Sequence, residues 1–258
     1  MQEQFWWHIT FNSNLLFTLK PFTNITAHLW TLSVEEQFYL LWPAVILLAP
    51  QRHLRTILIA AIAIAPLYRA AAIFVFASYE NAPWIITIGC FDSLGVGALL
   101  ALLEGNKRNQ ARLLTIGFWS LPAPILLALF GDQLFGGPWS KNVYSIGSTF
   151  SAFAFAWIIF SSVSRPIALL RSPVLTSIGV VSYGAYVFHL AAIQSVIHLY
   201  QNAFGQLLER GALLFALATM MTLSMAVVSW KLFEQPINSL KYRWPYAGER
   251  RLASNAGH

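Results

Sequence analysis

Long apolar stretches are the feature that most constrains the fold of this chain. Each has roughly 20 residues, about the length that a helix needs to cross the hydrocarbon core of a bilayer. Charged residues make up only 10% of the 258 residues, against about 25% in an average soluble domain. We therefore predict an all-α fold, a polytopic helical bundle in a membrane. About seven spans are expected, near residues 29–49, 55–77, 84–103, 113–130, 143–163, 174–200 and 211–233.

The basic residues between these spans predict the orientation of the chain. Lys and Arg are enriched in the cytoplasmic loops of membrane proteins. One side of the predicted bundle carries Arg52, Arg55, Lys107, Arg108, Arg112, Arg165, Arg171, Lys231, Lys241, Arg243, Arg250 and Arg251. The other side carries Lys20, Lys141 and Arg210. The N-terminus is therefore expected outside and the C-terminus, with a basic tail at 241–258, in the cytoplasm.

Two further features limit the classes of function. The net charge of +6 is spread between the spans rather than gathered in a patch, so no nucleic-acid partner is expected. Cys90 is the single cysteine, which excludes a disulfide within the chain and a cysteine metal site. No metal is expected.

Residues 1–27 combine aromatic side chains with Asn and Thr and are too polar to span. They suit an interfacial loop or short helix, where aromatic belts form. They also lack the pattern of a signal peptide. An outside N-terminus without a signal peptide means either that the aromatic leader tolerates translocation or that preceding helices are missing from this sequence.

The stretch HLWTLSVEEQFYLLWP at 28–43 places polar residues at the head of the first span. On an ideal helix, one narrow stripe holds His28, Thr31, Glu35, Tyr39 and Trp42, while Glu36 points about a quarter-turn away. Carboxylates inside a membrane helix are costly and mark functional sites by default. Glu35 is thus predicted to face a polar cavity. The alternative is a structural ion pair with another helix.

Arg69 and Asp92 lie inside the second and third predicted spans. Each stands eight residues from the outer end of its span, so antiparallel helices would place them at equal depth. We predict that they pair. Such a pair either fixes helix register or contributes to a substrate site, and both readings stay open. Gly89, Gly95 and Gly97 are expected to let a neighbouring helix approach closely.

The sixth predicted span brings Ser182, Tyr186 and His189 to one helical face, with Tyr183 beside it. A lone His between membrane helices is more often a hydrogen-bonded packing residue than a catalyst. A functional role for His189 remains the second reading. The last span ends near Glu234, where Pro236 is expected to stop the helix.

Four stretches in order resemble the membrane acyltransferase 3 family, the O-acyltransferases that modify glycans and other exported compounds. HLWTLSVEEQFYLLWP is similar to its signature, and CFDSLGVGALLA to its Asp-containing, glycine-rich helix. SIGVVSYGAYVFHL resembles its "SYxxYLxH" segment and WKLFEQPI its closing "ExP" element. The matched stretches lie within residues 11–240. Residues 1–240 are accordingly assigned to a partial acyltransferase 3 membrane domain.

The resemblance implies a ten-helix fold in which the signature opens the fourth helix. The chain would then hold the last seven, and the base, a His on the first helix, would be absent. Activity of this chain is therefore expected to be impaired, or to need a partner that supplies those helices. The location implied is the bacterial cytoplasmic membrane.

By the same resemblance, an acyl group, commonly acetyl, passes from a cytoplasmic acyl-CoA to a hydroxyl of an extracytoplasmic glycan or similar acceptor. Glu35 matches the family's carboxylate, which orients the base or binds the acceptor, and His28 matches a less fixed position. These two are the catalytic candidates. The substrate-binding candidates are Trp30, Ser33, Tyr39, Arg69, Asp92, Tyr183 and His189.

Two alternatives of different class remain. The chain is a transporter or flippase for a lipid-linked or sugar substrate, in which Glu35, Arg69 and Asp92 line a translocation path. Otherwise it is a non-catalytic membrane partner that complements an acyltransferase. Substrate flux without consumption of acyl-CoA would distinguish the transporter, and co-purification with an enzyme would distinguish the partner.

Overall fold

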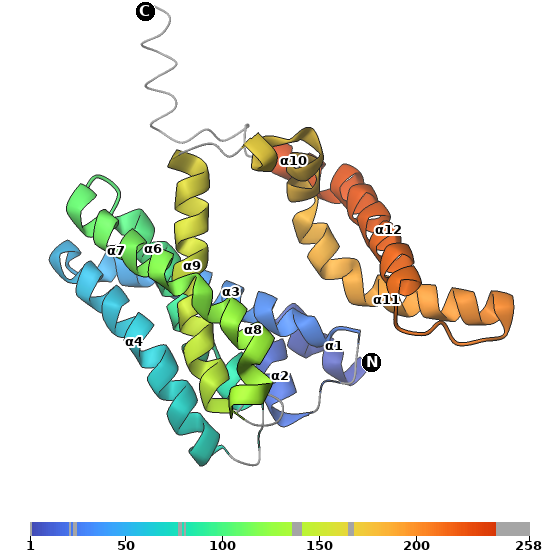
Figure 1. Cartoon of the computed structure of the whole chain (residues 1–258), viewed down its shortest axis with the longest axis horizontal. Coiled ribbons are helices and arrows are strands. Elements are labelled where there is room, and N and C mark those ends of the chain that lie inside the picture. The colour runs from blue at the N-terminus through green and yellow to red at the C-terminus, as the bar shows by residue number, and fades with distance from the viewer. Residues whose placement is uncertain are drawn as a thin grey trace, which may run out of the picture. The chain divides into compact units, whose positions relative to one another are not determined.

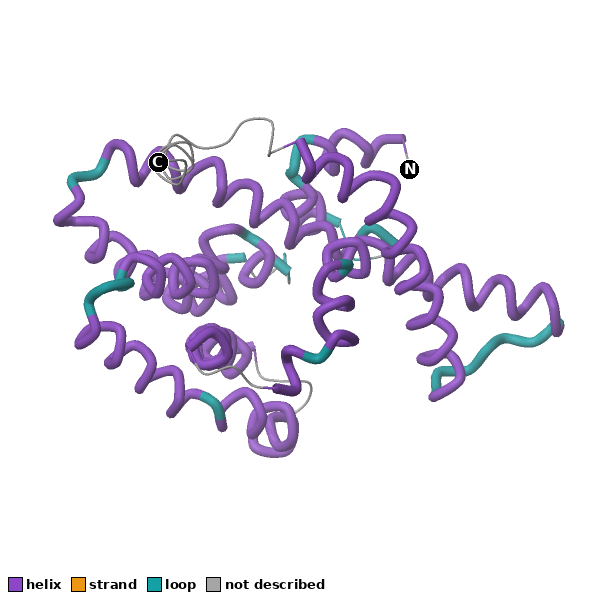
Figure 2. Tube along the Cα trace, turned by 90° about the horizontal axis from the view of Figure 1, so that it is seen from above, coloured by secondary structure: helices purple, strands orange, loops and turns teal. Residues whose placement is uncertain are grey.

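A computed structural model describes residues 2–20, 22, 25–76, 79, 81–135, 141–164 and 168–240. Within these residues every regular element is a helix (Figures 1 and 2). The predicted all-α class is therefore confirmed. The chain divides into two compact units, Met1–Pro166 and Ile167–His258, and each is described by itself. The predicted basic tail at 241–258 lies outside the described residues.

The first unit begins with two short helices and then holds the signature helix. Its elements are α1 (Gln2–Ile9), α2 (Ser13–Leu19), η1 (Ala27–Leu29), α3 (Trp30–Leu48), α4 (Gln51–Val75), α5 (Ala82–Ile85), η2 (Thr87–Cys90), α6 (Phe91–Leu102), α7 (Lys107–Ser120), α8 (Pro122–Phe135) and α9 (Lys141–Ser164). Helix α6 packs on both α4 and α9, and α7 also packs on α9 (Figure 1). These four helices form the centre of the unit.

The apolar core of this unit lies between α4, α6, α7 and α9. It contains Leu58, Ile62, Val96, Leu99, Leu103, Leu113 and Ala156. Gly95 permits the α4–α6 contact, because a Cβ atom there would stand 2.9 Å from Cγ1 of Ile62. Gly89 is equally crowded, with the Pro83 carbonyl oxygen 2.5 Å from its ideal Cβ position. The packing role predicted for these two glycines is confirmed.

Gly97 does not share this role. No atom outside its own helix and immediate neighbours lies within 4 Å of its ideal Cβ position. The prediction of close helix approach at Gly97 was wrong, because this residue faces a groove rather than a neighbouring backbone.

The second unit is a bent helical hairpin. Its elements are η3 (Ala168–Arg171), α10 (Pro173–Val180), α11 (Ser182–Phe204), α12 (Ala212–Ser229), the π-helical turn η4 (Trp230–Glu234) and α13 (Gln235–Ser239). Helices α10 and α11 meet at 72°, and α11 packs along α12. Gly205 ends α11 with φ at +68°, a left-handed conformation that favours glycine because it has no Cβ.

Helices occur at all seven predicted positions, but not all of them are long and apolar enough to cross a membrane. By length and composition, four described segments qualify: Gln51–Val75, Lys107–Gly131, Ile146–Ser164 and Ala212–Ser239. The bent pair Pro173–Val180 and Ser182–Phe204 would make a fifth. Helix α3 carries Glu35 and Glu36, and Thr87–Leu102 is a shorter apolar segment. Seven spans therefore remain a prediction.

Pro236 does not stop the last helix as predicted. The backbone passes from α12 through the π-helical turn into α13, which contains Pro236 near its start. Proline lacks the N–H for an intrahelical hydrogen bond, and the π-helical turn just before it changes the hydrogen-bond pattern at this point.

Candidate functional site

The signature helix α3 is held on one side by the N-terminal helices. Ser33 is buried, and its hydroxyl accepts a hydrogen bond from the backbone N–H of Ser13 at 3.0 Å. The same hydroxyl donates to the Leu29 carbonyl at 3.3 Å. Ser33 thus fixes the start of α2 against α3. Its predicted contact with substrate remains a prediction.

A second tie, which the sequence reasoning missed, uses Gln37 one turn further along α3. The amide nitrogen of Gln37 donates to the Phe11 carbonyl at 2.8 Å and to Oδ1 of Asn14 at 3.1 Å. Asn14 in turn donates to Oγ1 of Thr87 at 3.2 Å, and the Thr87 hydroxyl donates to Oε1 of Gln37. The spacing of four residues between Ser33 and Gln37 was the available signal, because it places both on one helical face.

His8 supports the same junction from α1. Its Nδ1 lies 2.7 Å from the Ser13 hydroxyl oxygen, within hydrogen-bond distance. Burial lowers the pKa of His8 below its usual value, because it disfavours the charged ring.

The opposite side of α3 is open. Glu35 is exposed, and no hydrogen-bond or ion-pair partner for its carboxylate occurs among the residues that the structure describes. Tyr39 lies one turn away on the same stripe and is 57% exposed. Trp42 follows, half-buried and stacked on Phe38 with the ring centroids 5.5 Å apart. An exposed carboxylate at the head of an apolar helix is therefore free to meet a ligand.

At the N-terminal end of the predicted stripe, the structure places His28 differently from the prediction. Helix α3 begins at Trp30, so His28 stands on the preceding 3₁₀ turn and not on the same α-helix. The Thr31 hydroxyl donates to the His28 carbonyl at 3.2 Å across this junction. Trp30 is half-buried and packs on the cluster of Leu16 and Phe17. Assignment of His28 to the stripe was wrong, because the backbone tightens before the helix begins.

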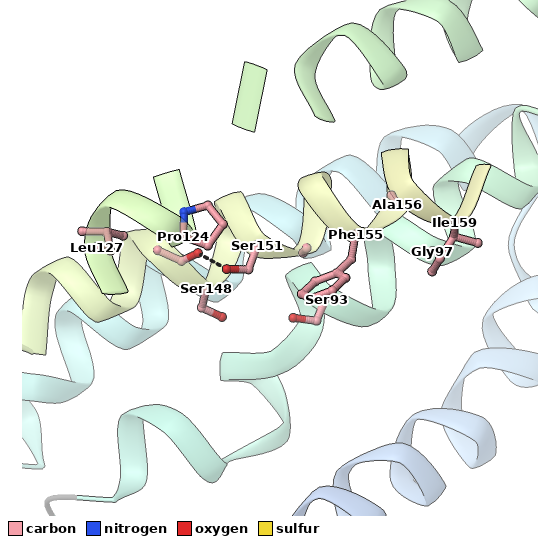
Figure 3. A pocket seen from close by; sticks show the side chains of 11 residues that line it. Ser93, Gly97, Pro124, Leu127, Ser148, Ser151, Phe155, Ala156 and Ile159 are labelled. Carbon is pink, nitrogen blue, oxygen red and sulfur yellow. Dashed lines mark hydrogen bonds between the residues drawn. The ribbon is translucent and has the colours of Figure 1, made fainter. Parts of the chain in front are cut away.

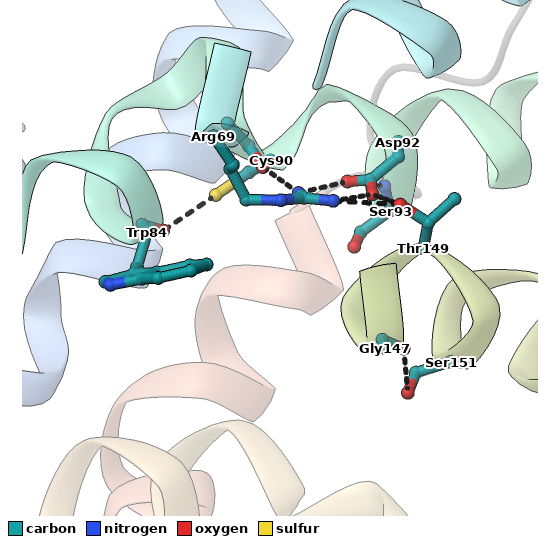
Figure 4. A network of polar contacts seen from close by, with 9 residues as sticks. Arg69, Trp84, Cys90, Asp92, Ser93, Gly147, Thr149 and Ser151 are labelled. Atoms are coloured by element: carbon teal, nitrogen blue, oxygen red, sulfur yellow. Dashed lines mark hydrogen bonds and ion pairs between the residues drawn. The ribbon is translucent and has the colours of Figure 1, made fainter. Parts of the chain in front are cut away.

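Arg69 and Asp92 form the predicted ion pair (Figure 4). The contact is bidentate, with Nη2 to Oδ2 at 2.6 Å and Nη1 to Oδ1 at 3.1 Å. Thr149, from α9, donates to Asp92 at 2.6 Å and accepts from Arg69 at 2.8 Å. Arg69 also donates to the Gly89 carbonyl. The side chains are only 2% and 0% exposed, so this network joins α4, α6 and α9 inside the unit.

A groove of about 470 Å³ lies beside this network, between α6, α8 and α9 (Figure 3). Ser93 connects the two, because its side chain lines the groove while its backbone N–H donates to Asp92 at 2.9 Å. Ser148 and Ser151 line the α9 side, and the Ser151 hydroxyl donates to the Gly147 carbonyl at 2.9 Å. Small side chains dominate the wall, which leaves the groove open.

The remaining candidates lie in the second unit. His189 is half-buried, and its Nδ1 stands 2.5 Å from the Tyr186 carbonyl oxygen. It lines a largely apolar groove of about 530 Å³ between α11 and α12. Tyr183 is exposed on the first turn of α11. The hydrogen-bonded histidine fits the packing role, and a functional role for either residue remains a prediction.

The second unit also brings together two of the motifs noted in the sequence. The ideal Cβ position of Gly184, in the SYGAY segment, lies 3.1 Å from Oε1 of Glu234 and 3.2 Å from Cα of Ala226. The Ser229 hydroxyl donates to Oε1 of Glu234 at 3.1 Å. The absence of a side chain at Gly184 thus lets α11 approach both Glu234 and the α12 backbone closely.

The described residues contain no group of three or more His, Cys, Asp and Glu side chains that is able to hold a metal ion. The polar groups present are the exposed carboxylate of Glu35 one helical turn from Tyr39, the buried Arg69–Asp92 ion pair, and three serines in a mostly apolar groove.

Comparison with known proteins agrees with this picture. A family model described as an acyltransferase domain matches residues 2–230. O-acetyltransferase OatA of Staphylococcus aureus strain NCTC 8325 / PS 47 is 28% identical over 258 residues, as is that of strain COL. The match covers 92% of this chain and 40% of those relatives, so the chain spans about two fifths of their length. No solved structure matches. The chain belongs to the acyltransferase 3 family.

Proposed function

We propose that this chain acts in membrane O-acylation, with a cytoplasmic acyl-CoA, most simply acetyl-CoA, as the donor. The acceptor is a hydroxyl of a glycan or similar compound outside the cytoplasm. In this reaction the thioester C–S bond breaks and an ester C–O bond forms. The hydroxyl proton passes to a base, and the coenzyme A thiolate takes up a proton on release.

The observation that carries the proposal is the open carboxylate of Glu35 on a helix that matches the family signature. A carboxylate at this place accepts a hydrogen bond from the acceptor hydroxyl or orients a base beside it. Tyr39, one turn away, supplies a second polar group and an aromatic face, which suits the apolar and polar faces of a sugar ring. Names of the matched relatives support acetyl as the transferred group.

The test compares Glu35→Gln with Glu36→Gln in cells that express the protein from its native locus. Glutamine keeps the size of glutamate but cannot carry charge. Base-released acetate from surface glycans is measured, with membrane abundance as the reference. We expect Glu35→Gln to lower acylation about 100-fold and Glu36→Gln to retain most of it. Full acylation by Glu35→Gln at normal abundance would contradict the proposed role.

The donor is tested separately. Membranes that contain the protein are supplied with labelled acetyl-CoA on the cytoplasmic side, and label is followed into the glycan fraction. Transfer that depends on Glu35 supports the proposal. Acylated glycan without labelled transfer would rule out acetyl-CoA as the donor.

We place the protein in the bacterial cytoplasmic membrane, with seven spans and the C-terminus inside. Helices α3 and α6 would also cross, with Asp92 neutralised by Arg69 and Glu35 near the outer end of α3. A green fluorescent protein fused after residue 240 should fluoresce, while alkaline phosphatase fused there should be inactive. The reverse result would invert the orientation.

The transporter alternative gains no support from the polar network. Arg69 and Asp92 neutralise each other inside the unit and are almost fully buried, so they do not line an open path. A measurement of substrate flux in proteoliposomes without acyl-CoA would decide between the two functions.

A further inference from the structure

The two N-terminal helices expose large apolar side chains on one face. A surface helix of a soluble protein buries its apolar stripe and exposes its polar face. Helix α2 buries two polar residues, Ser13 and Asn14, beside Leu16 and Phe17. Other large apolar side chains of both helices face outward. We call this pair of helices, residues 2–19, the N-terminal hairpin.

The inward face of the hairpin carries its polar anchors. Ser13 and Asn14 are each only 1% exposed. The Ser13 backbone is bonded to Ser33, and the Asn14 amide is bonded to Gln37 and Thr87. These contacts fix which face of α2 points away from α3.

The outward face is apolar. Its exposed fractions are 68% for Trp6, 52% for Ile9, 41% for Leu15 and 59% for Leu19. Leu15 and Leu19 are one helical turn apart, so they extend along one line of α2. Phe11 joins the two helices with φ at +53°, an uncommon conformation for a residue with a side chain. Its carbonyl is held by Gln37.

The contacts of the hairpin place it at the ends of longer helices. Helix α2 packs on the first turns of α3, where Ser33 and Gln37 lie. At its other end, the Phe17 carbonyl accepts a hydrogen bond at 3.2 Å from Asn81, which precedes α5. Helix α4, a segment long enough to cross a membrane, ends at Val75, shortly before this point. The hairpin therefore lies at the level where a span ends.

We propose that the N-terminal hairpin lies flat in the interfacial layer of the bilayer, with Trp6, Ile9, Leu15 and Leu19 in contact with lipid. Trp favours this layer because its ring combines an apolar body with a polar N–H group. The exposed Lys20 at the end of α2 is placed to meet a lipid phosphate, since a lysine stem buries in apolar surroundings while its charge stays at the boundary. Contact with the bilayer interface explains both why the outward face of the hairpin is apolar and why the hairpin lies at the level where a span ends.

The test measures the surroundings of single spin labels in the purified protein, reconstituted in phosphatidylcholine–phosphatidylglycerol vesicles. Cys90→Ala removes the single native cysteine. Labels are then placed by Leu15→Cys, Leu19→Cys and, in the other helix, Ile9→Cys. The ratio of relaxation by oxygen, which enriches in lipid, to relaxation by a water-soluble nickel complex reports the surroundings of each label.

Two reference positions calibrate that ratio. Leu67→Cys lies on α4 at a residue that is 68% exposed, and Glu104→Cys lies in the exposed turn after α6. We expect the hairpin labels to give ratios below that at Leu67, as befits the interfacial layer, and well above that at Glu104. Ratios like that at Glu104 would overturn the proposal, as would labels shielded from both reagents, which would indicate a protein partner. Leu19→Cys and Ile9→Cys stand in different helices, so failure of one variant to fold leaves the other as a test.

Discussion

The first unit contains two carboxylates in opposite circumstances, Asp92 and Glu35. Asp92 is fully buried and bound by Arg69 and Thr149. Glu35 is exposed, and the described residues offer it no ion-pair partner. Both stand in apolar helices, where a charge is costly. A carboxylate whose charge is neutralised by its neighbours stabilises the fold, whereas one left open at a helix head is available for chemistry.

The largest loss of stability is expected from breaking the buried Arg69–Asp92 ion pair, called the sealed pair below. Arg69→Ala or Asp92→Ala alone leaves a buried charge without its partner, which costs about 3–5 kcal/mol. Folded yield in detergent, measured by size-exclusion chromatography with fluorescence detection, should fall sharply for each. The double variant should recover much of the yield. If each single variant instead folds normally and abolishes acylation, the pair is part of the substrate site.

The next largest loss of stability is expected from substitutions on the polar side of α3, where Ser33 and Gln37 contact α2. Ser33→Ala removes the acceptor for the backbone N–H of Ser13 and leaves that buried group unsatisfied, at a cost of about 1–3 kcal/mol. We expect faster hydrogen exchange in α2 while exchange in α4 is unchanged. The matched control is Ser162→Ala, because the half-buried Ser162 hydroxyl donates to a carbonyl of its own helix. If hydrogen exchange in α2 is equally fast in the two variants, Ser33 does not anchor α2 to α3.

Two glycines of α6 test the packing around the sealed pair. In Gly95→Ala, the added methyl group would press on Ile62 at 2.9 Å, and overpacking typically costs about 1–3 kcal/mol. Gly97→Ala meets no atom within 4 Å and should stabilise the helix by up to about 1 kcal/mol. Thermal stability in detergent should therefore change in opposite directions. If both variants change thermal stability in the same direction, the close contact between α4 and α6 does not lie at Gly95.

The junction of α1 and α2 should weaken in acid. The pKa of His8 is lowered in the folded protein, so the undocked state takes up a proton more readily. Docking is then strongest above about pH 6.5, the ordinary pKa of histidine, and weakens as the pH falls through that value. Hydrogen exchange of α2 at pH 7.5 and 5.5, corrected for intrinsic rates, measures the change. His8→Gln should abolish the dependence on pH, and a dependence that survives it would have another origin.

The smallest effect on stability is expected at the open carboxylate. Glu35→Gln breaks no hydrogen bond or ion pair with another described residue, so the free energy of unfolding should change by no more than about 0.5 kcal/mol. Measured beside Asp92→Ala, this variant isolates the contrast between the two carboxylates. A large loss of stability would mean that Glu35 is a structural group, and the comparison would fail.

Depth along the helices was enough to predict the sealed pair. Arg69 and Asp92 stand at equal distances from the outer ends of their helices, and a charge in an apolar helix needs a partner. Thr149 escaped prediction because an isolated Thr has no distinctive pattern. The hydrogen-bonded role of Ser33 and Gln37 also escaped, since the helical period shows that they share a face but not what that face contacts.

The sequence by itself determined the class of the protein, since so few charges and such long apolar stretches leave only a helical membrane bundle. It also indicated the family and distinguished Glu35 from Glu36 by helical period. Only the tertiary structure decided which polar groups are already satisfied. Hydrogen bonds such as Ser13 to Ser33 and Asn14 to Thr87 join residues 20 and 73 positions apart, and local periodicity carries no information about such distant partners. For the same reason, the outward apolar face of the N-terminal hairpin emerged only when its polar anchors were located.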